Sequence, residues 1–500
     1  MVTYQDYLKI GDDPTKKLNF INDTIQQHKR SEKYKTAKTA ETYDQKRNET
    51  IENYQKVLYT VTGQSVPDNI SANYKLKSGF FNRFVTQQNQ YSLGNGVTWE
   101  KSKDVVEAKL GKDFNKRLKS AGRKAIVGGV SFGFFNFDHV EVFALTEFAP
   151  LFDEENGSLR AGVRFWQIDS TKPLRSTFYE EDGYTEYIWR QGKGEVLQEK
   201  RSYQQIVVSS EADGVEIYDG ENYPSFPIVP LYANEYKQSE LVGIREQIDC
   251  HDLIKSGYAN NVDEASMIYW TLQNSGGMDD IDLAKFIERM KTIHAADVEE
   301  GQATANSVEA PYASREALLT RLRSDLYADY MALDVDKISA GAVTATQIKA
   351  AYEAVDDKAD EYESCIVEFI QGILELAGID DNPTFTRSRI VNTQEEIQTV
   401  LSAATSLPDD YVTKKILDLL GDGDQVDDVL KQMADDELNR LNDEQTPKRQ
   451  ASMYEITSIL GKLKRKDITQ KTAIQMMIRI GMTEEEALEV MQAQKDEEEV

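Results

Sequence analysis

The side chains best suited to acid–base or metal chemistry are few and scattered. Histidine changes charge most readily near neutral pH and is a common ligand of zinc. The chain has four histidines, far apart in the sequence: His28, His139, His251 and His294. None belongs to an HExxH frame, in which two histidines one helical turn apart hold a zinc ion. The sequence therefore indicates neither a zinc enzyme nor a histidine-based active site.

One acidic segment has the beginning of a calcium-binding loop. Asp422, Gly423 and Asp424 match the first positions of such a loop. An EF-hand needs a further oxygen ligand and a glycine for the sharp turn. Val426 and Asp427 stand at the positions where these should follow. We predict no metal site and no cofactor.

Nucleotide and nucleophile motifs are also missing. The glycine-rich stretch 128–133 lacks the lysine and the Ser/Thr that a phosphate-binding P-loop requires, which argues against an ATP-driven motor. No G-x-S-x-G nucleophile elbow occurs. The chain has 86 acidic residues, so no particular pair stands out as general acid and base. We predict no catalytic residues and no enzyme; the alternative, a hydrolase using Asp or Glu, has no substrate that the sequence nominates.

The overall charge limits how the protein can treat nucleic acid. With 58 Lys and Arg against 86 Asp and Glu, the formal net charge is −28. Tight non-specific wrapping of DNA requires a surplus of basic residues, so this activity is excluded. Two readings remain open on charge alone: an ordinary acidic soluble protein, or a surface that DNA passes without sticking.

Cysteine content and hydropathy exclude two further classes. Two cysteines, Cys250 and Cys365, cannot build a disulfide framework, and both fall in expected helices, where we expect them to be small buried apolar residues. No stretch approaches the roughly 20 apolar residues needed to span a bilayer. We predict no membrane association.

The spacing of apolar residues along the chain predicts an α+β protein that is mainly helical. Five hundred residues exceed one hydrophobic core, so about two to four domains are expected. Residues 1–70 read as polar helices, and further helices are expected at 77–91 and 102–122. From 126 to 231 apolar residues recur at every second position, which predicts short strands, and Asn156-Gly157 is a hairpin signal.

The second half of the chain has a distinctive order of elements. A helix at 239–264 is followed by a mixed segment at 266–311 and a helix at 314–333. A loop of small residues, 334–346, leads into a helix from 344 to 377 that would be about 50 Å long. Gly378 is suited to end this helix, and a strand is expected at 384–386. Two loosely similar helical units, 397–433 and 456–491, complete the chain.

Three segments of the chain carry a resemblance to a known family. The first is Phe226–Leu231 leading into Glu240–Asp249, and the second is Ser339–Ala342 opening the helix that contains Tyr352 and Lys358. The third is Tyr91–Thr98, in which Asn95-Gly96 replaces the usual residues before Val97. Over roughly residues 15–445 the chain resembles the portal proteins of tailed bacteriophages, particularly long-tailed phages of Gram-positive hosts. Residues 450–500 lie outside the matched part.

The resemblance implies a portal fold with the following parts. It assigns 1–235 to a wing, 236–265 to stem helix 1, 266–311 to an α/β clip, 312–333 to stem helix 2, 334–346 to a tunnel loop, 347–395 to a long wing helix and return strand, and 396–500 to a helical crown and acidic tail. The implied protein is a ring of twelve subunits at one capsid vertex of the virion, assembled in the host cytoplasm. Its channel would serve DNA packaging, retention and ejection.

The resemblance also implies site residues and partners. Double-stranded DNA would pass the tunnel loop, at Lys337, Ser339, Ala340, Gly341, Ala342, Val343 and Thr344. The clip would dock the large subunit of the terminase motor, and later head-completion or adaptor proteins, through Met278, Asp279, Asp280 and Asp282. Major capsid and scaffolding proteins are further expected partners. For Arg315, Arg321 and Arg323 we expect salt bridges between subunits. The alternative is another virion structural protein, such as a minor capsid or connector component.

Overall fold

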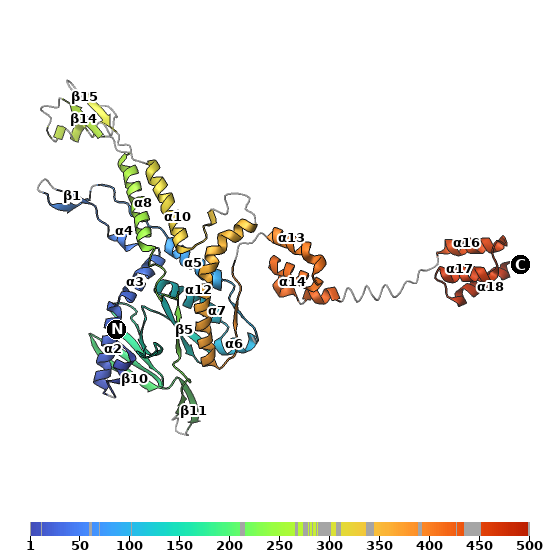
Figure 1. The fold of residues 1–500 in the computed structure, drawn as a ribbon, viewed down its shortest axis with the longest axis horizontal. Coiled ribbons are helices and arrows are strands. Elements are labelled where there is room, and N and C mark those ends of the chain that lie inside the picture. The colour runs from blue at the N-terminus through green and yellow to red at the C-terminus, as the bar shows by residue number, and fades with distance from the viewer. Residues whose placement is uncertain are drawn as a thin grey trace. The chain divides into compact units, whose positions relative to one another are not determined.

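The computed structural model of the chain describes residues 2–11, 13–59, 63–69, 71–101, 103–210, 216–265, 269–273, 279, 281–282, 284–286, 288, 302–306, 312–336, 345–388, 393–426, 428–434 and 452–498. The chain divides into two units, residues 1–390 and 391–500 (Figure 1). Helices and sheets are both abundant, so the expectation of an α+β protein rich in helix is confirmed.

Short polar helices begin the first unit. They are α1 (Tyr4–Leu8), α2 (Pro14–Arg30), α3 (Glu32–Asp44) and α4 (Glu49–Asn53). Asp13 caps α2, because its carboxylate accepts from the backbone N–H groups of Thr15 and Lys16. Ile21, Ile25 and His28 lie on the buried side of α2. The His28 Nε2 atom lies 2.8 Å from the Leu145 carbonyl oxygen, and burial lowers the pKa of this imidazole.

A two-stranded hairpin, β1 (Val57–Tyr59) and β2 (Ser65–Pro67), interrupts this helical region. The prediction of helix throughout 1–70 was wrong here. Three-residue strands are too short to produce a visible period of two. The chain then enters α5 (Phe80–Leu93), which ends before Gly94 as predicted, and β3 (Val97–Trp99).

The helix expected at 102–122 is divided into α6 (Lys103–Leu110) and α7 (Phe114–Gly128). Gly111 separates them with a φ of 80°, a left-handed backbone that interrupts the helix. The helical spacing grouped Val105, Leu110, Phe114 and Leu118 on one apolar side. Leu110, Phe114 and Leu118 belong to the main core, whereas Val105 is exposed and its neighbour Val106 is buried instead.

The β-rich region forms antiparallel sheets. β4 (Val130–Asn136), β5 (His139–Ala144) and β13 (Ile228–Tyr232) make one sheet in the order β13-β4-β5. A five-stranded sheet has the order β10-β9-β8-β7-β6, and its strands are β6 (Phe148–Phe152), β7 (Leu159–Trp166), β8 (Leu174–Glu180), β9 (Gly183–Arg190) and β10 (Lys193–Arg201). Gly157, with a φ of 69°, turns the chain between β6 and β7, as the Asn-Gly signal predicted. β11 (Gln204–Ser210) pairs with β12 (Glu216–Glu221).

The later helices of the first unit pack beside this core. They are α8 (Arg245–Ala265), α10 (Tyr312–Tyr330) and α12 (Ala345–Ala377). α8 and α10 lie side by side, and α12 crosses α5 and covers β13 (Figure 1). α8 starts later than predicted, because the backbone from 240 to 244 forms turns. Between α8 and α10, β14 (Tyr269–Gln273) pairs with β15 (Gln302–Asn306).

Buried aromatic and aliphatic side chains from α5, α7 and α12 form the main core, which includes Phe81, Phe84, Tyr362 and Phe369. Gly378, with a φ of 65°, ends α12, and a strand follows at β16 (Pro383–Phe385), both as predicted. The structure adds that β16 pairs with β3. Cys365 of α12 is half-buried, whereas Cys250 of α8 is exposed, so the expectation of burial for Cys250 was wrong.

The second unit is helical. It contains α13 (Thr393–Ala403) and α14 (Asp409–Leu420), which contact each other, and a separate three-helix cluster of α16 (Met453–Lys464), α17 (Gln470–Arg479) and α18 (Glu484–Glu498). Ala473, Met477 and Ala487 are fully buried in the small core of that cluster. The helices expected at 397–433 and 456–491 are therefore present.

Candidate functional site at the base of the 337–344 loop

The expected DNA-facing residues lie outside the described residues. This applies to Lys337, Ser339, Ala340, Gly341, Ala342, Val343 and Thr344. The structure does describe both ends of the segment that carries them. The segment leaves α10 after Tyr330 and enters α12 at Ala345. The contacts around these two ends determine how firmly the ends of the segment are held.

A tight turn ends α10. Met331 adopts a left-handed backbone with a φ of 60°, and its N–H donates to the Ala328 carbonyl over 3.0 Å. The N–H of Ala332 donates to the Tyr327 carbonyl over 2.9 Å, which satisfies another carbonyl in the last turn of the helix. A methionine in this left-handed conformation is uncommon, and the side chain of Met331 is itself exposed.

Tyr330, the last residue of α10, is buried at this turn. Its hydroxyl donates to Gln88 Oε1 over 2.6 Å, and its ring stacks on Phe84 with the centroids 4.6 Å apart. Both partners belong to α5. Burial raises the pKa of Tyr330 well above its ordinary value, so the hydroxyl stays protonated and remains a hydrogen-bond donor.

Lys358 of α12 joins three elements at this point. Its ammonium group donates to the Glu240 carboxylate over 2.6 Å and to the Tyr330 carbonyl over 3.0 Å. It also lies 3.7 Å from the centroid of the Tyr330 ring. The side chains of Lys358 and Glu240 are only 14% and 13% exposed. Removing either partner would leave a nearly buried, uncompensated charge, so this pair fixes α12 against the end of α10.

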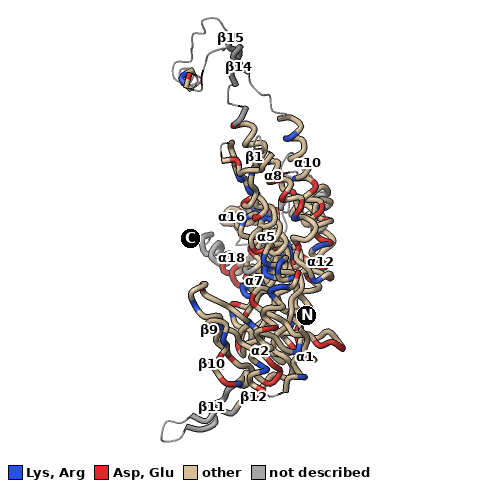
Figure 2. Tube along the Cα trace, turned by 90° about the vertical axis from the view of Figure 1, so that its left-hand side faces the viewer, with Lys and Arg blue, Asp and Glu red and all other residues tan. Residues whose placement is uncertain are grey.

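The segment after the turn is held on its other side by α5 and α10. Gln87 Nε2 donates to the Leu333 carbonyl over 3.1 Å. Arg323 Nη2 donates to Asp334 Oδ1 over 3.1 Å and also to Asp336. The hydrogen bond from Arg323 lowers the pKa of Asp336. Figure 2 shows acidic and basic residues close together along α10 and α12.

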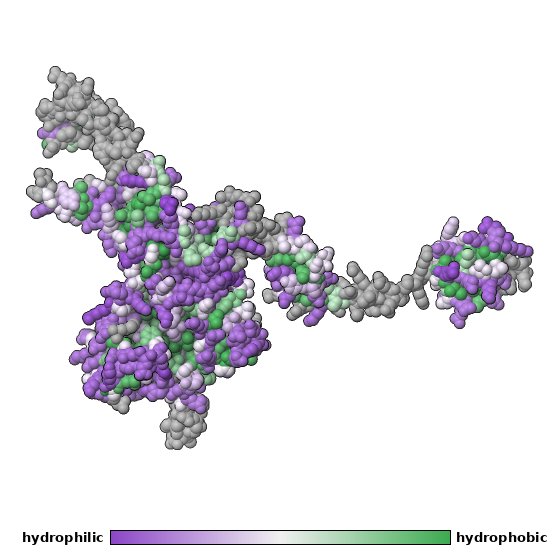
Figure 3. Space-filling model, in the orientation of Figure 1, coloured by the Kyte–Doolittle hydropathy of each residue, from purple (hydrophilic) through white to green (hydrophobic). Residues whose placement is uncertain are grey.

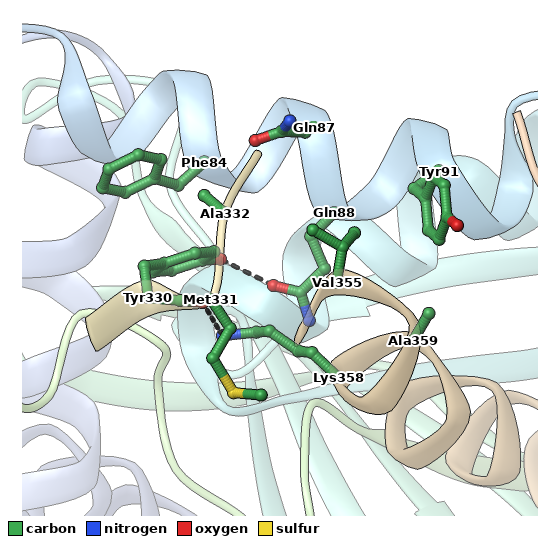
Figure 4. A pocket seen from close by; sticks show the side chains of 10 residues that line it. All are labelled: Phe84, Gln87, Gln88, Tyr91, Tyr330, Met331, Ala332, Val355, Lys358 and Ala359. Carbon is green, nitrogen blue, oxygen red and sulfur yellow. Dashed lines mark hydrogen bonds between the residues drawn. The ribbon is translucent and has the colours of Figure 1, made fainter. Parts of the chain in front are cut away.

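These contacts leave almost no space at the junction. The cavity enclosed by α5, the end of α10 and α12 has a volume of about 10 Å³ (Figure 4). That is about the volume needed to hold a single water molecule, far below the volume of a small-molecule site. Beside it lies an open groove of about 710 Å³ between α5 and residues 333–336, lined by Arg83, Arg323, Asp334 and Asp336 among others. The junction therefore functions as a brace and not as a ligand pocket.

The first turns of α12 are braced separately. Tyr352 stacks on Tyr91 of α5, with centroids 5.6 Å apart, and the Tyr91 hydroxyl donates to Asp356 Oδ1 over 2.6 Å. Arg387, which follows β16, donates to Asp356 over 3.0 Å and to the Glu363 carboxylate over 3.0 and 2.9 Å. A third carboxylate, Asp360, also accepts from Arg387. Both ends of the 337–344 loop are thus attached to α5.

Of the expected clip residues, Met278 and Asp280 lie outside the described residues. Asp279 is exposed, and its Oδ1 accepts from the backbone N–H groups of Ile281 and Asp282 over 3.0 and 2.9 Å. Asp282 lies 3.8 Å from the Lys285 ammonium group. The Asp279 carboxylate therefore caps a local turn.

Three arginines of α10 have partners within their own chain. Arg315 donates to the Gly257 carbonyl of α8 over 3.2 Å, Arg321 pairs with Asp325, and Arg323 holds residues 334–336. Sequence reasoning expected all three to bridge subunits, and it missed the roles of Glu240, Gln88 and Arg387. No local pattern identifies these residues, since their partners lie 24 to 242 positions away.

Among the residues that the structure describes, no group of three or more His, Cys, Asp and Glu side chains is arranged to hold a metal ion. In the same described ranges, no helix combines the length and the hydropathy that crossing a bilayer requires.

Comparison with known proteins supplies the family. The portal protein of Bacillus phage SPP1 is 23% identical over 400 residues, 71% of this chain and 75% of that protein. The portal protein of Clostridium phage phiCD119 is 26% identical over 197 residues, so the match spans only 44% of that protein and 37% of this chain. A chain from the neck of an empty gene transfer agent particle shares 10% identity with a TM-score of 0.41, over 68% of this chain and 90% of the other.

A family model supports the same assignment over most of the sequence. It is described as phage portal protein, SPP1 Gp6-like, and it matches residues 23–445. The match covers the helical N-terminus, the β-rich region, α8, α10, α12 and α14, and it stops before the three-helix cluster that starts at Met453. The chain belongs to the SPP1 Gp6-like family of phage portal proteins.

Proposed function

We propose that the chain forms a ring of twelve copies around a channel at one vertex of the capsid, through which double-stranded DNA is packaged, retained and ejected. The observation that carries the proposal is the brace at Lys358, which ties α12 to the end of α10. Tyr330 and Tyr352 attach these two helices to α5 on either side of the 337–344 segment. A loop held at both ends by close-packed helices keeps its position while DNA moves past it. The protein acts as a structural component and not as an enzyme.

We assign the parts of the family fold to segments of this chain as follows. Under this proposal residues 1–235 and 347–395 form the wing, α8 and α10 form the stem within 236–265 and 312–333, and 266–311 form the clip. Residues 334–346 form the tunnel loop and 396–500 the crown. The stiffness of the stem is supported by the packing of α8 against α10, including the contact of Tyr258 with Tyr312 at 5.7 Å between centroids.

The charge of the chain fits a channel that binds DNA weakly. The net charge of −28 opposes retention of phosphate along most of the surface. A ring of twelve Lys337 side chains would add a local attraction that salt screens, and the small residues Ser339, Ala340, Gly341, Ala342, Val343 and Thr344 would allow close approach to the duplex.

Docking partners follow from the same assignment. The clip, with Met278, Asp279, Asp280 and Asp282, would receive the large terminase subunit during packaging and head-completion or adaptor proteins afterwards. Major capsid and scaffolding proteins would surround the ring. The protein would reside in the virion, after assembly in the host cytoplasm.

Two experiments test the proposal. Electron microscopy of the purified full-length chain should show rings with a central opening.

Deleting residues 337–343 should leave these rings intact and impair DNA packaging or retention. The control Lys172→Gln, at an exposed turn between β7 and β8, should package like the wild type. Normal packaging by the deletion variant would refute the loop assignment. Absence of rings under all assembly conditions would favour the alternative, a different virion component.

A further inference from the structure

The hairpin of β1 and β2 exposes apolar side chains that a monomer would ordinarily bury. We call residues 54–59 and 63–67 the arm. Tyr59 is 75% exposed and Val57 is 50% exposed, and Leu58 and Val66 are also exposed. Figure 3 shows hydrophobic surface on the arm and over the nearby helices of this face. Scattered apolar residues are normal on a protein surface, but a contiguous group on a projecting element marks an interaction site.

Both faces of the arm are apolar. In the register of the hairpin, Val57 pairs with Pro67, Leu58 with Val66 and Tyr59 with Ser65. Because side chains alternate along a strand, Val57, Tyr59 and Pro67 share one face and Leu58 and Val66 share the other. A lone two-stranded hairpin is marginally stable in water at best. The arm is therefore built to be covered.

The chain that follows the arm, residues 74–78, is attached to α8 by regularly spaced hydrogen bonds, which we call the ladder. The backbone N–H groups of Tyr74, Leu76 and Ser78 donate to side chains of α8: Asn260 over 2.7 Å, Ser256 over 2.9 Å and Asp252 over 3.0 Å. Two residues of extended chain advance about 6.6 Å and four residues of helix about 6.0 Å, so the two repeats match. All three α8 side chains are buried. The returning strand that leads out of the arm is thus fixed along one flank of α8.

α10 packs on the other flank of α8. Gln247, Gly257 and Tyr258 of α8 contact α10 through Asp329, Arg315 and Tyr312. At 100° per residue, the α8 positions that face α10 lie roughly 150° around the helix from those that hold the arm. Figure 1 shows the same order, with β1 and α10 on either side of α8.

The first turns of α10 offer a small surface of short and apolar side chains on the side turned away from α8. Ala313 and Ala317 are exposed there, and the neighbouring Leu318 is 45% exposed. Small side chains allow large ones from another chain to approach the helix closely. One copy therefore carries large exposed apolar side chains on one flank of α8 and a small-residue surface on the opposite flank.

We propose that the arm of one copy packs on α10 of the next copy, so that successive copies are joined in one direction around the ring. A head-to-tail contact between different surfaces closes into a ring when the rotation between copies divides the circle. The partner that covers the arm is a second copy of this chain, because the surface of short side chains on α10 lies on the opposite flank of the same molecule. This inference rests on the proposed ring and identifies one contact that holds it together.

Cysteine cross-linking tests the contact directly. In a background with Cys250→Ser and Cys365→Ala, a chain with Leu58→Cys is mixed with a chain carrying Ala313→Cys, Ala317→Cys or Leu318→Cys and oxidised in the assembled state. We expect disulfide-linked dimers in at least one mixture, and a ladder of higher oligomers when both cysteines are in one chain. The control pairs Leu58→Cys with Ile168→Cys, at a position 83% exposed near the end of β7. Cross-linking no greater than this control in all three mixtures would overturn the proposal, as would a disulfide confined within one chain.

Assembly provides a second measure. The double variant Leu58→Glu and Tyr59→Glu should keep the thermal unfolding transition of the wild type, because both residues are exposed, and should lower the ring fraction at least tenfold at equal concentration. Ile168→Glu should assemble normally. Normal rings in the double variant would overturn the arm contact and leave the ring proposal standing; if those rings failed only in tail attachment, the arm would instead bind a different protein. A wild-type chain that never forms rings would refute the proposed function itself.

Discussion

The ammonium group of Lys358 lies 3.0 Å from the backbone carbonyl oxygen of Tyr330 and 3.7 Å from the centroid of its ring. One lysine of α12 thus satisfies a carbonyl at the end of α10 and covers the aromatic side chain that ends the helix. Together with the bond to Glu240, this contact fixes α12 against the end of α10.

Replacing this lysine should destabilise the first unit. Lys358→Met removes the buried partner of Glu240 and should cost about 3 kcal/mol in the free energy of unfolding, because a nearly buried carboxylate loses its counter-charge. Adding Glu240→Gln should restore part of the loss. Thermal or urea unfolding measures both effects. Lys35→Met, which removes the exposed pair with Glu32, should change stability by less than about 0.5 kcal/mol. Equal effects of the two lysine variants would contradict the brace.

Arg323 should control access to the loop. Arg323→Gln releases Asp334 and Asp336, so the segment after α10 loses two charged contacts. We expect faster trypsin cleavage after Lys337, with little change in the unfolding transition. Mass analysis of the fragments measures the rate of this cleavage. The matched control is Arg321→Gln, two residues away on the same helix, whose partner Asp325 lies within α10. Identical cleavage rates in both variants would show that Arg323 does not restrain the segment.

Asp252 should be the most sensitive position in the ladder on α8. Its carboxylate accepts from the Ser78 backbone N–H and from Asn48 Nδ2 over 3.0 Å each, and the side chain is fully buried. Asp252→Ala leaves the buried Asn48 amide and the half-buried Ser78 N–H without their acceptor and should cost about 2–3 kcal/mol. Glu246→Ala, at an exposed position of α8, should be nearly neutral. Chemical denaturation of the full chain distinguishes the two, and a neutral Asp252→Ala would refute the ladder.

His28 should make stability depend on pH in a defined direction. Burial lowers its pKa in the folded state below the ordinary value of 6.5, so the unfolded chain binds the proton more readily. Stability should therefore fall as the pH drops below about 6.5, by at most about 1.4 kcal/mol per pH unit, and level off below the folded-state pKa. His28→Gln keeps a donor for the Leu145 carbonyl and should flatten this part of the curve between pH 7.5 and 5.5. If the stability of both proteins changed equally with pH over this range, His28 would not be the cause of the dependence.

Much of the element order could be predicted from the sequence, because local signals determine it. The apolar spacing of α12 and the glycine at 378 gave its bounds, and Asn156-Gly157 located the turn between β6 and β7. These features depend on side chains within a few positions of each other, where periodicity and turn propensity act directly. The order of elements was also sufficient to indicate the portal family.

Only the tertiary structure could reveal the brace and the arm. Lys358, Glu240 and Tyr330 are separated by 28 to 118 positions, and the ladder joins residues 74–78 to α8 across 174 to 186 positions. A lysine at a helical position looks the same in a sequence whether it is solvated or buried against a carboxylate. Its role is decided by which elements pack around it, since burial removes the water that would otherwise satisfy its charge.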